Sequence, residues 1–288
     1  MWLRKLADWA ASTAAPPPIG LELRPDRFAL LHVDRPAAGP PHILGHARHR
    51  LPSSDPGAAA AVLHDAWARL ALPNHRVVVS LPSPPARFTL LPTAAWMKSG
   101  AAAIWPDITA GQWTCVARLL PGQPARVLVG AVPNEALESA LTLLDLAGLA
   151  AAQVQIDVLA LLTAYRHTPA WTGDTPLARL LIHADDDGYR WYRLSPTDGL
   201  PEATGEATHE TGGFAALADQ HPERVFLAGP AARVRTLLTD LQATLQDVRF
   251  CSNPFAGLPL THDQDRRSLT AQAPELSVAL GLALGAHR

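Results

Sequence analysis

Cysteine is scarce in this chain of 288 residues, where only Cys115 and Cys251 occur. Neither belongs to a Cys-x-x-Cys pair and no His-Glu-x-x-His segment is present, which excludes the commonest zinc and redox motifs. Two cysteines far apart in apolar surroundings are expected to be free, buried thiols in a reducing compartment. The sequence therefore predicts neither a disulfide framework nor a cysteine-based metal site.

An excess of basic residues is also missing. Lys and Arg together number 24 against 26 Asp and Glu, which gives a formal net charge of -2. Proteins that bind nucleic acid carry a basic stripe or patch, so we expect no nucleic-acid partner. Hydrophobic residues make up 48% of the chain and charged residues 17%, which is enough apolar surface to build one large domain or two smaller ones.

The apolar stretch at residues 275–285, ELSVALGLALG, has no charge after Glu275 but is too short to span a bilayer. Its alternation of large and small residues fits a strand. The same residues in a helix would place Gly281 and Gly285 one turn apart on nearly the same face. In both forms we expect a buried closing element whose small residues let the backbone pack closely.

Residues 1–18 are predicted to be an amphipathic segment followed by a linker. Trp2, Leu6 and Trp9 recur at helical spacing, and charged residues interrupt the apolar core that a signal peptide would need. A short helix with two tryptophans could touch a membrane surface or a partner, but an ordinary docking helix is the simpler interpretation. The proline run that follows is predicted to be a linker.

Strands and helices follow one another in a repeated order. The predicted strands are residues 19–23, 27–33, 77–82, 87–92, 115–120, 126–132, 177–184, 189–196 and 224–229, with 93–112 less regular and a polar loop through Gly213. Helices are predicted at 55–72, from a cap at Asn134 to Gly148, in the segment entered from Val154, and at 231–245. Strands come first and helices second in both halves, which indicates a duplicated α/β architecture.

Two clusters could bind a metal ion. Asp185, Asp186 and Asp187 precede Gly188 and could hold a divalent cation, but they lack the ligand spacing of an EF-hand, and a hairpin turn explains them. The residues His42, His46 and His49 are spaced for chelation, yet no nearby cysteine or carboxylate completes a site. We expect an ordinary turn, solvated histidines and no bound metal.

Two further positions could carry chemistry. Ser80 follows an apolar strand, but its surroundings lack the small residues of a nucleophile elbow. Gly229 ends a strand and opens a helix, where a phosphate could approach, although a phosphate loop would need several glycines. No set of side chains is spaced as acid, base and nucleophile, so we predict no catalytic residue.

Taken together, these elements resemble the PilM family, actin-like proteins of type IV pilus assembly, and its shorter relatives in competence and DNA uptake. The resemblance rests on RVLVGAVPNEALESALTLLDLAGLAAAQVQIDVLAL at 126–161, on VFLAG at 225–229, and on NPFAGLPL and APELSVALGLALG near the end. It implies an α/β, actin-like (ribonuclease H-like) two-domain fold with duplicated mixed sheets flanked by helices and a reduced second half. The implied limits are 1–18 for the N-terminal segment, 19–160 for the first domain with an insertion at about 86–126, 161–276 for the second, and 277–288 for a closing helix.

In that family ATP lies between the two halves, held by two hairpin turns and a pair of glycines. The matching positions here are Glu22, Arg24, Pro25, His183, Asp185, Asp187, Gly229 and Pro230. All of them except Gly229 depart from the family pattern. A bulky residue and a proline without an N–H cannot cradle phosphate, and added carboxylates repel it. The resemblance thus implies a degenerate cleft, a protein that is not an ATPase, and no cofactor, with ATP and Mg²⁺ disfavoured.

The family also implies a partner. PilM receives the N-terminal tail of the bitopic membrane protein PilN and connects it, with PilO- and PilP-like proteins, to the pilus motor. Here the tail would dock on the insertion, where Phe88, Trp96 and Trp105 are candidate groove residues, although buried core tryptophans are an equal alternative. We expect a cytoplasmic scaffold, peripheral to the inner membrane. A working actin-like ATPase and the cytoplasmic part of a type II secretion platform are the alternatives.

Overall fold

The structure is a computed structural model that describes residues 19–34, 36, 39–52, 55–72, 74–82, 85–109, 111–120, 125–171, 177–186, 188–208, 217–260 and 266–285. The amphipathic segment and linker predicted at 1–18, and Asp187, lie outside the described residues. Among the helices of the described ranges, none is both long and apolar enough to cross a bilayer.

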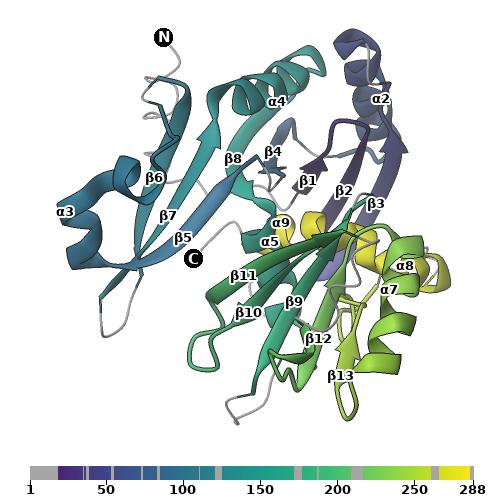
Figure 1. Ribbon diagram of the computed structural model, residues 1–288. Helices are drawn as coiled ribbons and strands as arrows, with labels where there is room; N and C mark the ends of the chain where they lie inside the picture. Colours follow the sequence, from purple (N-terminus) through teal and green to yellow (C-terminus); the bar gives the residue numbers. More distant parts are fainter. Residues whose placement is uncertain are drawn as a thin grey trace.

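Strands and helices follow one another along the described chain (Figure 1). The strands are β1 (Ile19–Leu23), β2 (Arg27–Asp34), β3 (His42–Arg50), β4 (Arg76–Leu81), β5 (Arg87–Pro92), β6 (Trp113–Leu120), β7 (Arg126–Pro133), β8 (Ala150–Ile156), β9 (Arg179–Ala184), β10 (Gly188–Leu194), β11 (Pro201–Thr208), β12 (Arg224–Ala228) and β13 (Arg249–Cys251). The helices are α2 (Pro56–Arg69), α3 (Thr93–Ile104), α4 (Asn134–Leu146), α5 (Asp157–Arg166), α7 (Ala231–Thr244), α8 (Arg266–Gln272), the 3-10 helix η1 (Ala273–Leu276) and α9 (Ser277–Gly285).

Two five-stranded sheets share one topology. The first has the order β3-β2-β1-β4-β8 and the second the order β11-β10-β9-β12-β13. In each, the first three strands form an antiparallel meander and the last two run parallel to the central strand. This repeat confirms the predicted duplicated α/β architecture with mixed sheets.

A smaller antiparallel sheet, with the order β5-β7-β6, stands beside the two large sheets and carries α3 (Figure 1). The segment at 93–112 that looked irregular in the sequence contains α3, which is kinked at Gly100 where φ is +64°. Phe88 of β5 contacts Tyr192 of β10 with 5.8 Å between ring centroids. The small sheet is therefore packed against the second half of the molecule.

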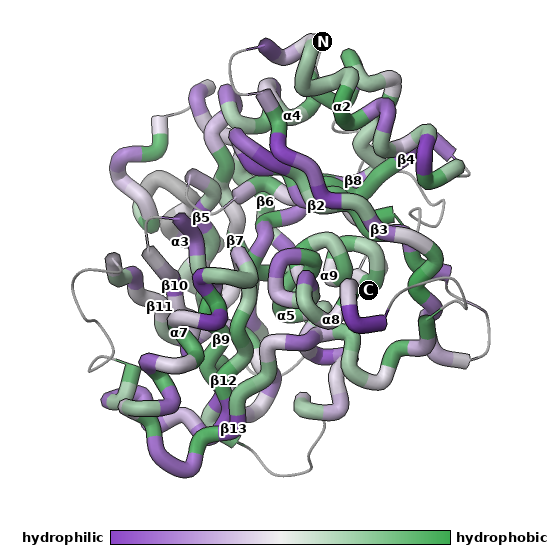
Figure 2. The backbone as a smooth tube through the Cα atoms, turned by 90° about the vertical axis from the view of Figure 1, so that its right-hand side faces the viewer, coloured by the Kyte–Doolittle hydropathy of each residue, from purple (hydrophilic) through white to green (hydrophobic). Residues whose placement is uncertain are grey.

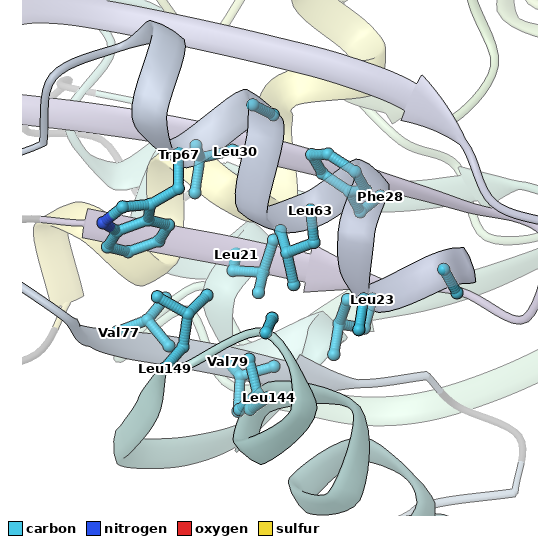
Figure 3. Close-up of a cluster of buried hydrophobic side chains, with 14 of the residues drawn as sticks. Leu21, Leu23, Phe28, Leu30, Leu63, Trp67, Val77, Val79, Leu144 and Leu149 are labelled. Atoms are coloured by element: carbon cyan, nitrogen blue, oxygen red, sulfur yellow. The ribbon is translucent and has the colours of Figure 1, made fainter. Parts of the chain in front are cut away.

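The core of the first half lies between its sheet and the helices α2 and α4 (Figure 3). Alternate residues of the predicted hairpin, such as Leu21 and Phe28, point toward Leu63 and Trp67 of α2. The indole of Trp67 donates to the backbone oxygen of Asn74 at 3.1 Å, which satisfies its one polar atom. On the second sheet, α7 covers the corresponding outer face.

Helices α5 and α9 lie side by side between the two large sheets (Figure 2). A Cβ on Gly281 would come within 1.7 Å of the backbone oxygen of Ala160, and a Cβ on Gly20 within 2.1 Å of that of Ala279. Only glycine permits such a close approach of α9 to α5 and to β1. The closing stretch is thus a helix, which decides between the two forms that its alternating pattern allowed.

Some local predictions were wrong. Asn134 is the first residue of α4 and not its cap; its side chain accepts from Thr114 at 2.7 Å and donates to the oxygen of Gly111 at 2.8 Å. The polar loop predicted through Gly213 contains β11, and the three-residue β13 was not predicted. By contrast, Gly148 ends α4 with φ +73°, as expected for a glycine after a helix.

Candidate functional site

Three turns from distant parts of the chain meet between the two halves. The turn after β1 carries Arg24, the turn after β9 carries Asp185, and Gly229 and Pro230 join β12 to α7. They border a cavity of about 150 Å³, which we call the cleft. Five of the positions that the resemblance assigned to a degenerate nucleotide site line this cleft: Glu22, Arg24, His183, Gly229 and Pro230. Asp185 joins them by its bond to Arg24, whereas Pro25 is not part of the lining.

Arg24 occupies the centre of this meeting point, with 8% of its surface exposed. Its guanidinium donates to Glu22 at 2.8 Å, and to Asp157 and Asp185 at 3.2 Å each. Burial by itself would lower the pKa of Arg24, but the three carboxylates outweigh that effect and raise it. Arg24 is therefore a permanent cation held by both halves of the molecule.

His183 of β9 completes the group and is 3% exposed. Burial lowers the pKa of His183 well below its ordinary value, and the charges of Arg24, Arg190 and Arg27 lower it further. Its Nε2 lies 3.1 Å from a guanidinium nitrogen of Arg24, which can only donate, so Nε2 must be the acceptor and the proton sits on Nδ1. His183 is a neutral member of an otherwise charged cluster.

A second arginine joins the two hairpin turns. Arg27 donates to Asp185 at 3.2 Å and to Asp186 at 2.8 Å, so that Arg24 and Arg27 share Asp185. Burial alone would raise the pKa of Asp185, but Arg24, a hydrogen bond from the backbone of Asp186, and Arg27 keep it lowered. The cations beside these aspartates are arginines, and no group of described residues has the arrangement of a metal site.

On the third side of the cleft, Glu275 of η1 binds the start of α7. Its Oε1 accepts from the backbone N–H of Ala231 at 2.7 Å, and its other oxygen pairs with Arg48. A carboxylate at a helix N-terminus takes the place that an external anion would occupy. Sequence reasoning missed this role, although Glu275 is the only charge in the closing stretch.

Gly229 is required at this side of the cleft by its backbone. Its φ is +117°, and an added Cβ would lie 2.2 Å from the backbone oxygen of Ala184. Glycine thus allows the end of β12 to pass close to the end of β9. The following residue, Pro230, has no N–H to offer a ligand.

The three candidate partner-binding residues are spread over the small sheet and its helix. Phe88 lies against Tyr192, whereas Trp96 is half-buried on α3 and Trp105 is half-buried just after that helix. Arg87 stacks over Trp113 at 5.1 Å and pairs with Asp107, which ties the segment after α3 to β5. Among the residues that the structure describes, the ring of Phe88 does not stack on that of Trp96 or Trp105.

The other predicted polar positions have structural places. The histidines at 42, 46 and 49 lie in the edge strand β3 and are half-buried, so the prediction that they are solvated was wrong. Ser80 is fully buried on β4 beside Glu22 of β1. Of the two thiols, Cys115 is exposed and Cys251 is partly buried, so the prediction of buried thiols was wrong for Cys115.

Comparison with solved structures identifies the fold. A structure described as a PilM-PilN type IV pilus biogenesis complex superposes with a TM-score of 0.75, at 18% identity, over 96% of this chain and 100% of that one. The fold is actin-like. A Bacteroides thetaiotaomicron protein with an actin-like ATPase fold and unknown function gives a TM-score of 0.51 at 13% identity, over 85% and 93% of the two chains.

The cytoplasmic domain of EpsL, an inner-membrane component of the type II secretion system of Vibrio cholerae, is more distant, with a TM-score of 0.47 at 15% identity over 83% and 98% of the two chains. No protein-family model matches the sequence, and no curated protein matches it. In this chain the cleft lies between the two halves that carry the duplicated sheets.

Proposed function

We propose that this protein is a cytoplasmic scaffold of a type IV pilus or DNA-uptake machine, peripheral to the inner membrane, which works without hydrolysing ATP. The ion-pair cluster around Arg24 is the observation that supports a function without ATP hydrolysis. It already joins the two hairpin turns that a nucleotide would have to bridge.

A nucleotide would have to compete with this cluster. A triphosphate entering between the turns would meet Asp185 and Asp186, and it would have to draw Arg24 away from Glu22 and Asp157. Leaving buried carboxylates unpaired costs several kcal/mol. The internal carboxylate of Glu275 holds the start of α7 in the same way. Both arrangements favour a cleft that stays closed without a ligand.

The partner part of the proposal rests on the fold. The solved structure with a TM-score of 0.75 is that of a complex of PilM with PilN. By that likeness we propose that the small sheet receives the N-terminal tail of a PilN-like bitopic membrane protein, and that PilO- and PilP-like proteins and the motor are reached indirectly.

Calorimetric titration with Mg·ATP tests the nucleotide part. We expect no saturable heat at millimolar ATP, because the phosphate positions are filled by the protein's own charges. Saturable binding at micromolar concentration would overturn the proposal in favour of a working actin-like ATPase.

Peptide binding tests the partner part. A labelled peptide from the N terminus of a PilN-like protein of the same genome should bind the wild type and bind Trp96→Ala or Trp105→Ala more weakly, by about tenfold for each lost aromatic contact. Trp191→Ala is the matched control, since Trp191 is half-buried on β10 and packs toward α7. Equal binding by the wild type and all three variants would remove these two residues from the site, and binding only to the tail of a secretion-platform protein would favour that alternative.

A further inference from the structure

The end of the second sheet away from the cleft carries a row of arginines. Arg179 begins β9 and is the register partner of Arg224, which begins β12 and in turn pairs with Arg249 of β13. Neighbouring strands lie about 4.8 Å apart, so these like charges start side by side. Four residue steps along β9 separate Arg179 from His183, roughly 13 Å at 3.3 Å per step. The row is therefore distinct from the cleft.

Trp171 organises this end of the sheet. The guanidinium of Arg179 lies 5.0 Å from the centre of its ring, and that of Arg166, the last residue of α5, lies at 5.6 Å. Arg166 also donates to the backbone oxygen of Asp198 at 2.8 Å, and Arg224 donates to that of Ala170. These contacts hold two guanidinium groups over the ring of Trp171 and the third at the neighbouring residue, and they use only part of the five donors of each group.

The described part of the chain supplies no carboxylate partner to these three arginines. Among the residues that the structure describes, neither Arg166, Arg179 nor Arg224 forms an ion pair with a carboxylate. Burial and the charge of Arg224 lower the pKa of Arg179 by more than the charge of Glu223 raises it. Burial lowers the pKa of Arg179 and the charge of Arg224 lowers it further; burial and Arg179 act in the same way on the pKa of Arg166.

Arg179 differs sharply from the arginine of the cleft. It is 6% exposed against 8% for Arg24. Arg24 has three carboxylate partners, whereas the described residues offer Arg179 a hydrogen bond from Nη2 to the backbone oxygen of Trp171, at 3.4 Å, and no partner for its Nε. A buried cation without an anion is costly, and an unpaired buried donor adds to the cost. The arrangement is explained if an external anion completes it.

We propose that Arg166, Arg179 and Arg224 form a binding site for the phosphate group of a small phosphorylated molecule or of a lipid headgroup. Guanidinium groups donate paired hydrogen bonds to phosphate oxygens, and several guanidinium groups can share one dianion. Trp171 keeps two of them in place before the ligand arrives, which reduces the entropy cost of binding. The inference depends on the second half alone and not on the proposed scaffold function.

The test measures thermal unfolding of the full chain with inorganic pyrophosphate, against sodium chloride of equal ionic strength. We expect pyrophosphate at 100 times its dissociation constant to raise Tm by roughly 5 °C. The double variant Arg166→Gln/Arg224→Gln should lose most of this rise. Arg233→Gln/Arg235→Gln, which changes two exposed arginines of α7, should keep it.

Calorimetric titration with pyrophosphate measures affinity directly, and so distinguishes lost binding from a general loss of stability. We expect the double variant to bind pyrophosphate about tenfold more weakly than the control variant does. Co-sedimentation with vesicles containing one-quarter phosphatidic acid tests the lipid source. Binding to pyrophosphate alone assigns the site to a small molecule, and binding to vesicles alone assigns it to a headgroup. Absence of both, or equal binding by the double variant and the control, overturns the proposal.

Discussion

The two ends of β9 show how one protein treats a buried arginine in two ways. At the cleft, Arg24 lies among carboxylates that the chain itself supplies, two of them from residues far away in the sequence. At the other end, Arg179 lies among further arginines and an aromatic ring. The comparison teaches that an internally neutralised cation closes a site to ligands, while an uncompensated one leaves a place for an anion. Helix α5 connects the two ends, since it begins with Asp157 and ends with Arg166.

The largest expected effect concerns the cleft. Arg24→Ala removes the partner of two buried carboxylates and should lower the free energy of unfolding by about 3–5 kcal/mol, measured by urea denaturation. Arg27→Ala is the control, because its ion pairs are partly exposed and should contribute no more than about 1 kcal/mol. Similar losses in the two variants would show that burial does not distinguish these arginines.

Gly281→Ala should disturb both ends together. The added Cβ would collide with the backbone oxygen of Ala160 and displace α5, at an expected cost of about 1–3 kcal/mol. Because α5 carries Asp157 and Arg166, this variant should also bind pyrophosphate more weakly than the wild type. Thr236→Ala on the exposed face of α7 serves as the control, and unchanged stability in Gly281→Ala would contradict the close approach.

The neutral histidine of the cleft predicts a pH dependence. The pKa of His183 is lowered in the folded protein, so below about pH 6.5 the unfolded chain takes up a proton that the folded chain does not. Stability should therefore fall as pH drops below about 6.5, by up to about 1.4 kcal/mol per pH unit from this residue. Glu22 has the opposite effect on stability. Burial raises the pKa of Glu22, so the folded chain keeps a proton that the unfolded chain loses, and this contribution to stability falls as pH rises above the ordinary pKa of a glutamate. His183→Gln should flatten the slope measured by urea denaturation between pH 6.5 and 5, and an unchanged slope would refute the assignment.

The smallest effect is expected at the other end of β9. Arg179→Met keeps most of the apolar stem over Trp171 and removes a buried charge to which the described residues supply no carboxylate. The variant should therefore lose less than about 1 kcal/mol of stability in phosphate-free buffer, and it can gain stability. If Arg179→Met lost as much free energy of unfolding as Arg24→Ala, Arg179 would have an internal anionic partner, and the two arginines would not differ in this respect.

Much of the fold could be predicted from the sequence because its signals are local. The hairpin of β1 and β2 follows from the turn at Arg24–Asp26 between two apolar runs, and Gly148 marks the end of α4. Strand β11 escaped prediction because PEATGEAT has few hydrophobic residues, and β3 because its histidines and arginines resemble a solvated loop. Pairing with β10 and β2, respectively, gives these edge strands their form.

The site was less predictable, since its interactions are not local. The resemblance assigned Arg24 and Asp185 to one cleft but gave no reason to expect them to pair, because 161 residues separate them. Asp157 was not assigned to the cleft, because a carboxylate at the first position of a helix is ordinary. Arg179, Arg224 and Arg249 could not be grouped before the strand register was known.

The position of α9 has a consequence for how the protein is made. Helix α9 fills the space between β1 and α5. The inner face of β1, the first described strand, is therefore covered only after α9, the last described helix, has been synthesised. During synthesis at about 5–20 residues per second, more than ten seconds pass between the two. Over that interval the first sheet exposes apolar surface and is open to chaperones or to aggregation. The nascent chain should gain protease resistance only after residue 285 has left the ribosome.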